Sequence, residues 1–266
     1  MNHVETVQLT DVSIGYRTRQ GVRTVAKGIT AALRQGELTC LLGPNGVGKS
    51  TLLRTLSAFQ PCLSGTISID GRPLHDYSAK ELAQHIGVVL TECPDVQQMT
   101  VWQMVAMGRS PYTGFWGSLH ADDERVVNEA INLVGIAPLA ERQVATLSDG
   151  ERQKVMIAKA LAQQTAVIFL DEPTAFLDYP SKVDTLLLLS RICHEQQHTV
   201  LLSTHDIELA MQVADTLWLL QEGGALDIGS PRSLADDGVL RRFVEDGHNV
   251  VFDDATFSIH VKKSAV

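Results

Sequence analysis

The stretch that decides the fold is Gly43-Pro44-Asn45-Gly46-Val47-Gly48-Lys49-Ser50, which fits the pattern G-x-x-x-x-G-K-[ST] in full and is followed by Thr51. An apolar run at residues 38–42 precedes it, and leucines at helical spacing follow it, so it should join a strand to a helix that begins near Lys49. In that setting, glycines let backbone N–H groups turn inward, and these groups and the helix N-terminus hold phosphate oxygens. We therefore predict a nucleotide-phosphate site rather than a plain glycine-rich turn, with Lys49 at the β- and γ-phosphates and Ser50 on Mg²⁺.

A second apolar run, at residues 167–170, leads directly into Asp171-Glu172-Pro173. Carboxylates at the carboxyl end of a buried strand lie where open α/β sheets bind their ligands. We expect Asp171 to bind Mg²⁺, directly or through water, and Glu172 to accept a proton from the attacking water. Such a pair alone would usually cap or solvate a strand end, but the upstream phosphate loop favours the functional interpretation.

Strand and helix patterns alternate along the rest of the chain, which is typical of an α/β protein with a mostly parallel sheet. The N-terminal part should form strands with a turn around Gly21. Further strands are expected at residues 66–71, 86–90 and 199–203, and helices at 101–108, 122–134, 151–162 and 181–195. The signal weakens after Gly224, where alternation of Phe257, Ile259 and Val261 predicts a final strand.

A third motif lies between the two nucleotide motifs and suggests a family. Leu147-Ser148-Asp149-Gly150-Glu151-Arg152-Gln153 resembles the LSGGQ-type signature of ABC ATPases. The resemblance implies a P-loop NTPase fold of the ABC ATPase type, with a mixed β core and antiparallel N-terminal strands. It also implies a single ABC ATPase domain over residues 1–266, with a helical signature subdomain at about 93–164 and a C-terminal extension at about 225–266.

The resemblance assigns roles to further residues. Ser148 can cap the following helix, leaving N–H groups beside Gly150 and Glu151 to bind the nucleotide. An ordinary capped helix without a nucleotide contact is the alternative interpretation of the same residues. Tyr16 matches the aromatic residue that stacks on adenine, with a packed strand-end tyrosine as the alternative. His205 resembles the switch histidine that contacts the γ-phosphate. Residues 175–178 resemble the D-loop that crosses a dimer interface.

The sequence departs from the family pattern at the Q-loop. Glu92 stands where the family usually has glutamine, in Leu90-Thr91-Glu92-Cys93. Its carboxylate can still offer an oxygen to Mg²⁺ or to the catalytic water, so a catalytic and metal-binding role is expected. It also adds a negative charge beside the phosphates, which leaves the role and the register of this loop open. Asp149 and Glu151 replace the usual glycine and glutamine of the signature.

A segment early in the helical part points to a branch of the family. Residues 107–112, Met-Gly-Arg-Ser-Pro-Tyr, resemble the G-R-x-P-[YW] segment of importers for iron-siderophores, haem and vitamin B12 (cobalamin). A surface loop with proline and aromatics is the plainer interpretation. The resemblance implies an ATP-hydrolysing subunit that forms a homodimer around ATP and Mg²⁺. Two permease subunits and an extracytoplasmic substrate-binding protein would complete the system, with this chain peripheral on the cytoplasmic face of the inner membrane.

Two other functions are weighed against an importer subunit. A non-transport ABC ATPase of repair or translation would usually carry two cassettes or long coiled-coil insertions, and a P-loop kinase would lack the signature. The net charge of −9 argues against a nucleic-acid binder. No stretch approaches the roughly 20 apolar residues of a membrane span, and no signal peptide is expected. The four scattered cysteines are expected to be free thiols.

Overall fold

A six-stranded sheet forms the centre of the protein. The structure is a computed structural model that describes residues 4–19, 21–91, 98–114, 117–246 and 249–262. The strand order is β10-β9-β3-β8-β7-β6, with β10 antiparallel to β9 and the other strands parallel. The strands are β3 (Leu38–Leu42), β6 (Ile86–Val89), β7 (Val167–Leu170), β8 (Thr199–Ser203), β9 (Thr216–Leu220) and β10 (Leu226–Gly229).

The central strands are buried on both faces, which explains their unbroken apolar sequences. Alternate residues point to opposite faces of a strand. Leu41, Phe169 and Trp218 therefore belong to the core on one face, and Cys40 and Leu170 to the core on the other. The predicted α/β fold with a mostly parallel sheet is confirmed.

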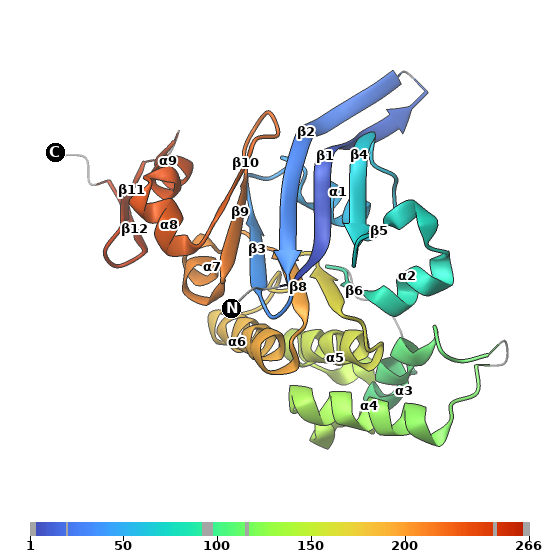
Figure 1. Ribbon diagram of the computed structural model, residues 1–266. Coiled ribbons are helices and arrows are strands. Elements are labelled where there is room, and N and C mark those ends of the chain that lie inside the picture. Colours follow the sequence, from blue (N-terminus) through green and yellow to red (C-terminus); the bar gives the residue numbers. More distant parts are fainter. Residues whose placement is uncertain (1–3, 20, 92–97, 115–116, 247–248, 263–266) are drawn as a thin grey trace.

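A second, antiparallel sheet covers one face, in the order β2-β1-β4-β5. It is formed by β1 (Glu5–Thr18), β2 (Gly21–Arg34), β4 (Ser64–Ile69) and β5 (Arg72–Pro73), and it shares a hydrophobic core with helix α1 (Lys49–Leu56). The N-terminal antiparallel strands were predicted from the sequence. The β1–β2 hairpin projects beyond the body of the molecule (Figure 1).

Helices cover the other face. α3 (Val101–Ala106), α4 (Ala121–Val134) and α5 (Asp149–Ala162) pack on one another, and α6 (Tyr179–Gln196) and α7 (Ile207–Val213) lie nearer β3 and β8 (Figure 1). The short helix α2 (Ala79–His85) follows β5. The single ABC ATPase domain over residues 1–266, its helical subdomain at about 93–164 and its C-terminal extension at about 225–266 stay predictions. None of the helices in the described part of the chain combines the length and the apolar character of a membrane span.

The C-terminal region holds α8 (Pro231–Asp236), α9 (Val239–Glu245), β11 (Val250–Asp253) and β12 (Ser258–Val261), at the opposite end of the molecule from α2 and α3 (Figure 1). The expected final strand is present, but Phe257 does not belong to it. Its backbone is left-handed, with φ +52°, and its ring packs edge-on against Phe252 at 6.2 Å between centroids. Packing of this aromatic pair across the turn therefore outweighs the alternating pattern at Phe257.

Candidate functional site

The phosphate loop joins β3 to α1, and close packing demands glycine at two of its positions. Gly48 has φ +119°, and a Cβ there would lie 2.4 Å from Cγ1 of Val25. A Cβ on Gly43 would lie 2.6 Å from the carbonyl oxygen of Leu220. A side chain at Gly48 would displace the Val25 side chain of β2, and one at Gly43 would displace the backbone of β9, so close packing against both sheets favours glycine at these positions.

Lys49 begins α1, and its side chain folds back over the loop. Its Nζ donates to the carbonyl oxygens of Gly43 at 2.8 Å and Pro44 at 3.1 Å, and lies 3.4 Å from Nδ1 of His205. Burial lowers the pKa of Lys49, and the negative charges of Glu172 and Asp171 oppose that shift. The ammonium thus lies between the loop and the acidic residues that end β7.

The carboxylate of Asp171 is held by hydroxyl groups. Its Oδ1 accepts from Ser50 Oγ at 3.1 Å and from Ser203 Oγ at 2.7 Å. The backbone N–H of Glu172 donates to the same Ser203 hydroxyl at 2.9 Å. Thr91 Oγ1 donates to the carbonyl oxygen of Asp171 at 2.7 Å. The structure therefore brings two of the three predicted metal ligands, Ser50 and Asp171, into direct contact.

Glu172 occupies a strained backbone position with φ +50°, in the left-handed region that residues with a Cβ seldom adopt. Its carboxylate oxygen Oε1 lies 2.5 Å from Nε2 of His205, which follows β8. β7 and β8 are parallel neighbours, so their carboxyl ends bring these two predicted residues to one edge of the sheet.

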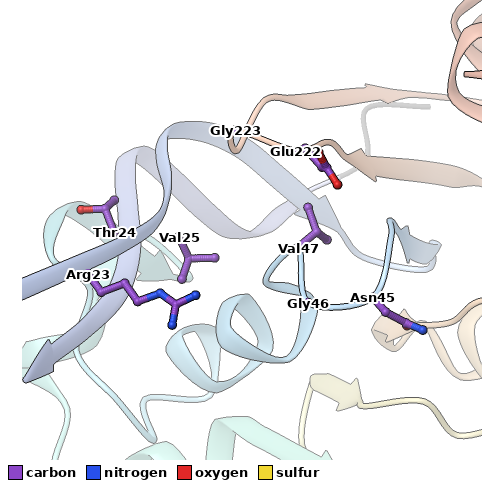
Figure 2. Close-up of a pocket in the computed structure, with 8 residues that line it drawn as sticks. All are labelled: Arg23, Thr24, Val25, Asn45, Gly46, Val47, Glu222 and Gly223. Carbon is purple, nitrogen blue, oxygen red and sulfur yellow. The ribbon is translucent and has the colours of Figure 1, made fainter. Parts of the chain in front are cut away.

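Tyr16 approaches the same region from the antiparallel sheet. Its hydroxyl lies 2.6 Å from Thr51 Oγ1, and the ring is 41% exposed. This tyrosine is therefore neither buried nor remote from the loop. A cavity of about 260 Å³ is lined by Tyr16, Arg23, Val25, Asn45, Gly46, Gly48, Lys49, Ser50, Thr51 and Glu172. A neighbouring cavity of about 310 Å³ lies between β2, the loop and the turn at Glu222 and Gly223 (Figure 2).

The signature residues lie elsewhere. Ser148 caps α5, and Glu151 returns its carboxylate to the Ser148 N–H at 2.9 Å, forming a reciprocal capping box. This backbone hydrogen bond lowers the pKa of Glu151. Gly150 lies beside Ser181: a Cβ atom added to this glycine would lie 3.1 Å from the Ser181 Oγ. None of the three lines the cavity at the phosphate loop.

Residues 108–112 are fixed to the helices rather than free on the surface. Arg109 is buried, and its Nε donates to Asp123 Oδ1 at 2.8 Å. One terminal nitrogen donates to the carbonyl oxygen of Ala162 at 2.9 Å and to Gln164 at 2.8 Å. The guanidinium lies over the Tyr112 ring, 4.0 Å from its centroid. This segment therefore ties α3 to the N-terminus of α4 and the C-terminus of α5.

Some site residues were not found from the sequence, and one lies outside the described residues. Glu92 belongs to the latter, so its predicted role is left as it stands. Ser203 and Arg23 were missed. The signal for Ser203 was a hydroxyl residue at the carboxyl end of an apolar strand, the same position that Asp171 takes relative to β7.

Comparison with known proteins decides the family. Residues 26–175, more than half of the chain, match the family model described as ABC transporter. The chain belongs to the ABC transporter family. The resemblance seen in the sequence is thereby confirmed, and so are the ABC ATPase fold and an ATPase activity coupled to transport.

Similar proteins include ATP-binding proteins named for the transport or import of different compounds. The ferric enterobactin transport ATP-binding protein FepC of Escherichia coli (strain K12) is 37% identical over 231 residues, which cover 87% of this chain and 84% of that protein. The hemin import ATP-binding protein HmuV of Streptomyces coelicolor is 38% identical over 229 residues, covering 85% and 80%. A dimeric ATP-binding cassette bound to ADP and Pi, in a post-hydrolysis state, has a TM-score of 0.72 at 25% identity, covering 85% of this chain and 98% of that one.

Proposed function

We propose that this cassette is the ATPase subunit of an importer for a chelated metal, either an iron-siderophore, haem or cobalamin. The observation that carries the proposal is the presence, in one chain, of the phosphate loop with its acidic strand end and of the buried Arg109 segment. The phosphate loop and the acidic strand end bind and hydrolyse the nucleotide. Residues 107–112, which contain Arg109, are the segment that resembles this importer branch. Relatives named for ferric enterobactin and for hemin are 37% and 38% identical to this chain, which supports the class of cargo without selecting one compound.

Hydrolysis would proceed at the edge where β3, β7 and β8 end. The loop N–H groups and Lys49 would hold the phosphates, and Tyr16 the adenine. Glu172 would take a proton from the attacking water, with His205 orienting its carboxylate and facing the γ-phosphate. The 2.5 Å contact between Glu172 and His205 supports this division of roles.

Mg²⁺ fits the residues present. Magnesium in nucleotide sites is usually held by one or two protein oxygens together with substrate phosphates, so a larger carboxylate cluster is not needed. Ser50 and Asp171 offer hard oxygen donors already in contact at 3.1 Å. When bound, the ion would neutralise phosphate charge. Glu92 is the third proposed ligand and lies outside the described residues.

A homodimer would complete the ATP site. Ser148, Gly150 and Glu151 do not line the cavity at the phosphate loop of their own chain. α5 begins in a solvent-exposed turn that Ser148 caps, and the N-terminus of a helix can bind an anion. In a head-to-tail pair, each ATP would lie between the phosphate loop of one chain and the Ser148 turn of its partner. The dimeric, ADP-bound cassette of similar fold supports this arrangement.

The remaining partners follow from the proposed class. Two permease subunits would receive the dimer at the cytoplasmic face of the inner membrane, near residues 92–116. An extracytoplasmic substrate-binding protein would deliver the cargo. ATP binding would close the dimer and hydrolysis would reopen it, a rigid-body change that the permease could follow.

Fractionation of the native cell tests the proposal. A tagged chain should sediment with membranes, co-purify with a multi-span permease and be released when that permease is absent. The purified complex in proteoliposomes should then take up a ferric siderophore, haem or cobalamin only when ATP is supplied. A chain that stays with ribosomes or DNA and ignores the permease would instead support a non-transport ABC ATPase.

A further inference from the structure

Arg23 lies opposite Tyr16 in the β1–β2 hairpin. The two residues are direct partners in the antiparallel register, so their side chains lie on the same face of the hairpin. The Tyr16 hydroxyl contacts Thr51 at the start of α1. That contact shows that this face of the hairpin looks toward the phosphate loop.

Arg23 also forms a wall shared by two cavities. It lines the cavity that contains Lys49, Ser50 and Thr51, and it lines the neighbouring one beside Glu222. Figure 2 shows the Arg23 and Val25 side chains extending from β2 toward the side of the phosphate loop, whereas Thr24 points to the other side of the strand. The exposed Arg23 side chain therefore extends on the side of the hairpin that faces the phosphate loop.

The Arg23 guanidinium is also not engaged elsewhere. Within the described residues, Arg23 makes no hydrogen bond or ion pair, whereas Lys49 donates to two loop carbonyls. Arginine has five N–H donors in a planar fork that matches phosphate oxygens. Because Arg23 makes no hydrogen bond or ion pair with the described residues and faces the phosphate loop, its guanidinium is available to pair with an anion bound there.

We infer that Arg23 is a nucleotide-binding residue whose guanidinium pairs with the α-phosphate of ATP. This inference rests on the proposed function, because Tyr16 is proposed to hold the adenine and Lys49 the β- and γ-phosphates. Arg23 is the strand partner of Tyr16, so it lies at the end of the cavity nearest the base, where the α-phosphate begins the chain. A contact there would contribute equally to ATP and ADP binding.

The test compares Arg23→Gln with Arg17→Gln by equilibrium binding of ATP and ADP. Arg17 is a matched control, because it is exposed, neighbours Tyr16 in β1 and lies on the opposite face of the hairpin. Arg23→Gln should weaken ATP and ADP by the same factor, about tenfold, which corresponds to about 1.4 kcal/mol. Arg17→Gln should leave both affinities within about twofold of the unmodified chain, since one distant exposed charge contributes little.

Three results would overturn the inference. The first is unchanged nucleotide affinity in Arg23→Gln, which would leave the guanidinium without a nucleotide contact. The second is a loss confined to ATP, which would place the contact at the γ-phosphate. The third is an equal loss in Arg17→Gln, which would indicate a general charge effect. If the unmodified chain binds neither nucleotide, the proposed function fails, and that result is distinct from all three.

Discussion

Nε2 of His205 lies 2.5 Å from Oε1 of Glu172, although the two residues follow different strands. The parallel pairing of β7 with β8 brings their carboxyl ends together, and the other ring nitrogen of His205 lies 3.4 Å from Nζ of Lys49. One imidazole therefore lies between the proposed base and the proposed phosphate-binding lysine. Ser203, from the same strand end, holds the Asp171 carboxylate and the Glu172 N–H.

Glu172→Gln should abolish turnover while leaving ATP binding intact. Glutamine preserves the size and the hydrogen-bonding reach of the side chain but cannot accept a proton, and general bases contribute about 100-fold or more. Phosphate release should therefore fall by at least about that factor, with the ATP affinity unchanged. Glu195→Gln, on the exposed side of α6, is the control. Hydrolysis at the original rate would remove Glu172 from the role of base.

His205→Ala should lower the hydrolysis rate by about tenfold or more, because the Glu172 carboxylate loses the group that orients it. The comparison is with His194→Ala, since His194 makes a similar contact with Asp215, at 3.0 Å, away from the phosphate loop. Steady-state phosphate release measures both variants. Equal rates for the two variants would contradict a role for His205 at the site.

Arg109→Met should destabilise the fold by about 3–5 kcal/mol, because it leaves the buried Asp123 carboxylate without its cation. Urea denaturation measures this loss. Arg125→Met is the matched control, since Arg125 pairs with Glu129 on an exposed face of α4, the helix that carries Asp123, and little change is expected there. A double variant, Arg109→Met with Asp123→Leu, should recover much of the loss. Equal stability of the Arg109 and Arg125 variants would disprove a structural role for the buried pair.

The free energy of unfolding should depend on pH in acid through the ionisation of Asp123. The backbone N–H of His120, and then the Arg109 guanidinium, lower the pKa of Asp123. A carboxyl group whose pKa is lower in the folded state than in the unfolded chain, where it is about 3.9, stabilises the fold at pH values above the unfolded pKa. This stabilisation is lost as the pH falls through the folded pKa. The stability advantage over Asp123→Asn should therefore be constant between about pH 7 and 5 and narrow in stronger acid. Urea titrations at each pH measure it, and a gap that widens toward acid would have the wrong sign.

The sequence was most informative where one local pattern determines one element. The apolar run before Gly43 predicted β3, and the leucines at helical spacing after the loop predicted α1. Both patterns lie within the element that they predict. By contrast, α2 and β9 were not found. α2 buries none of its residues, so its helix formers and the capping box between Ser78 and Glu81 come without an apolar face of helical spacing. β9 has the apolar run typical of a buried strand, but it lies in the region just before the signal weakens at Gly224.

The site was predictable residue by residue but not as a network. The apolar run before the two acids identified Asp171 and Glu172, and the family resemblance assigned His205, while the contacts among these residues depend on the order of strands in the sheet. Ser203 enters the site only because β8 lies beside β7. Arg23 enters only because the hairpin register places it opposite Tyr16. Neither relationship can be deduced from spacing along the chain.

The proposal that two copies share each ATP is tested most directly by size-exclusion chromatography with light scattering, in the presence of ATP. The hydrolysis-deficient chain carrying Glu172→Gln should elute as a dimer with two bound ATP molecules. Adding Ser148→Arg should leave a monomer that still binds ATP, because the phosphate loop is untouched and only the partner's contact is blocked. A monomer of the unmodified chain that hydrolyses ATP, or a dimer that persists with Ser148→Arg, would contradict the shared site.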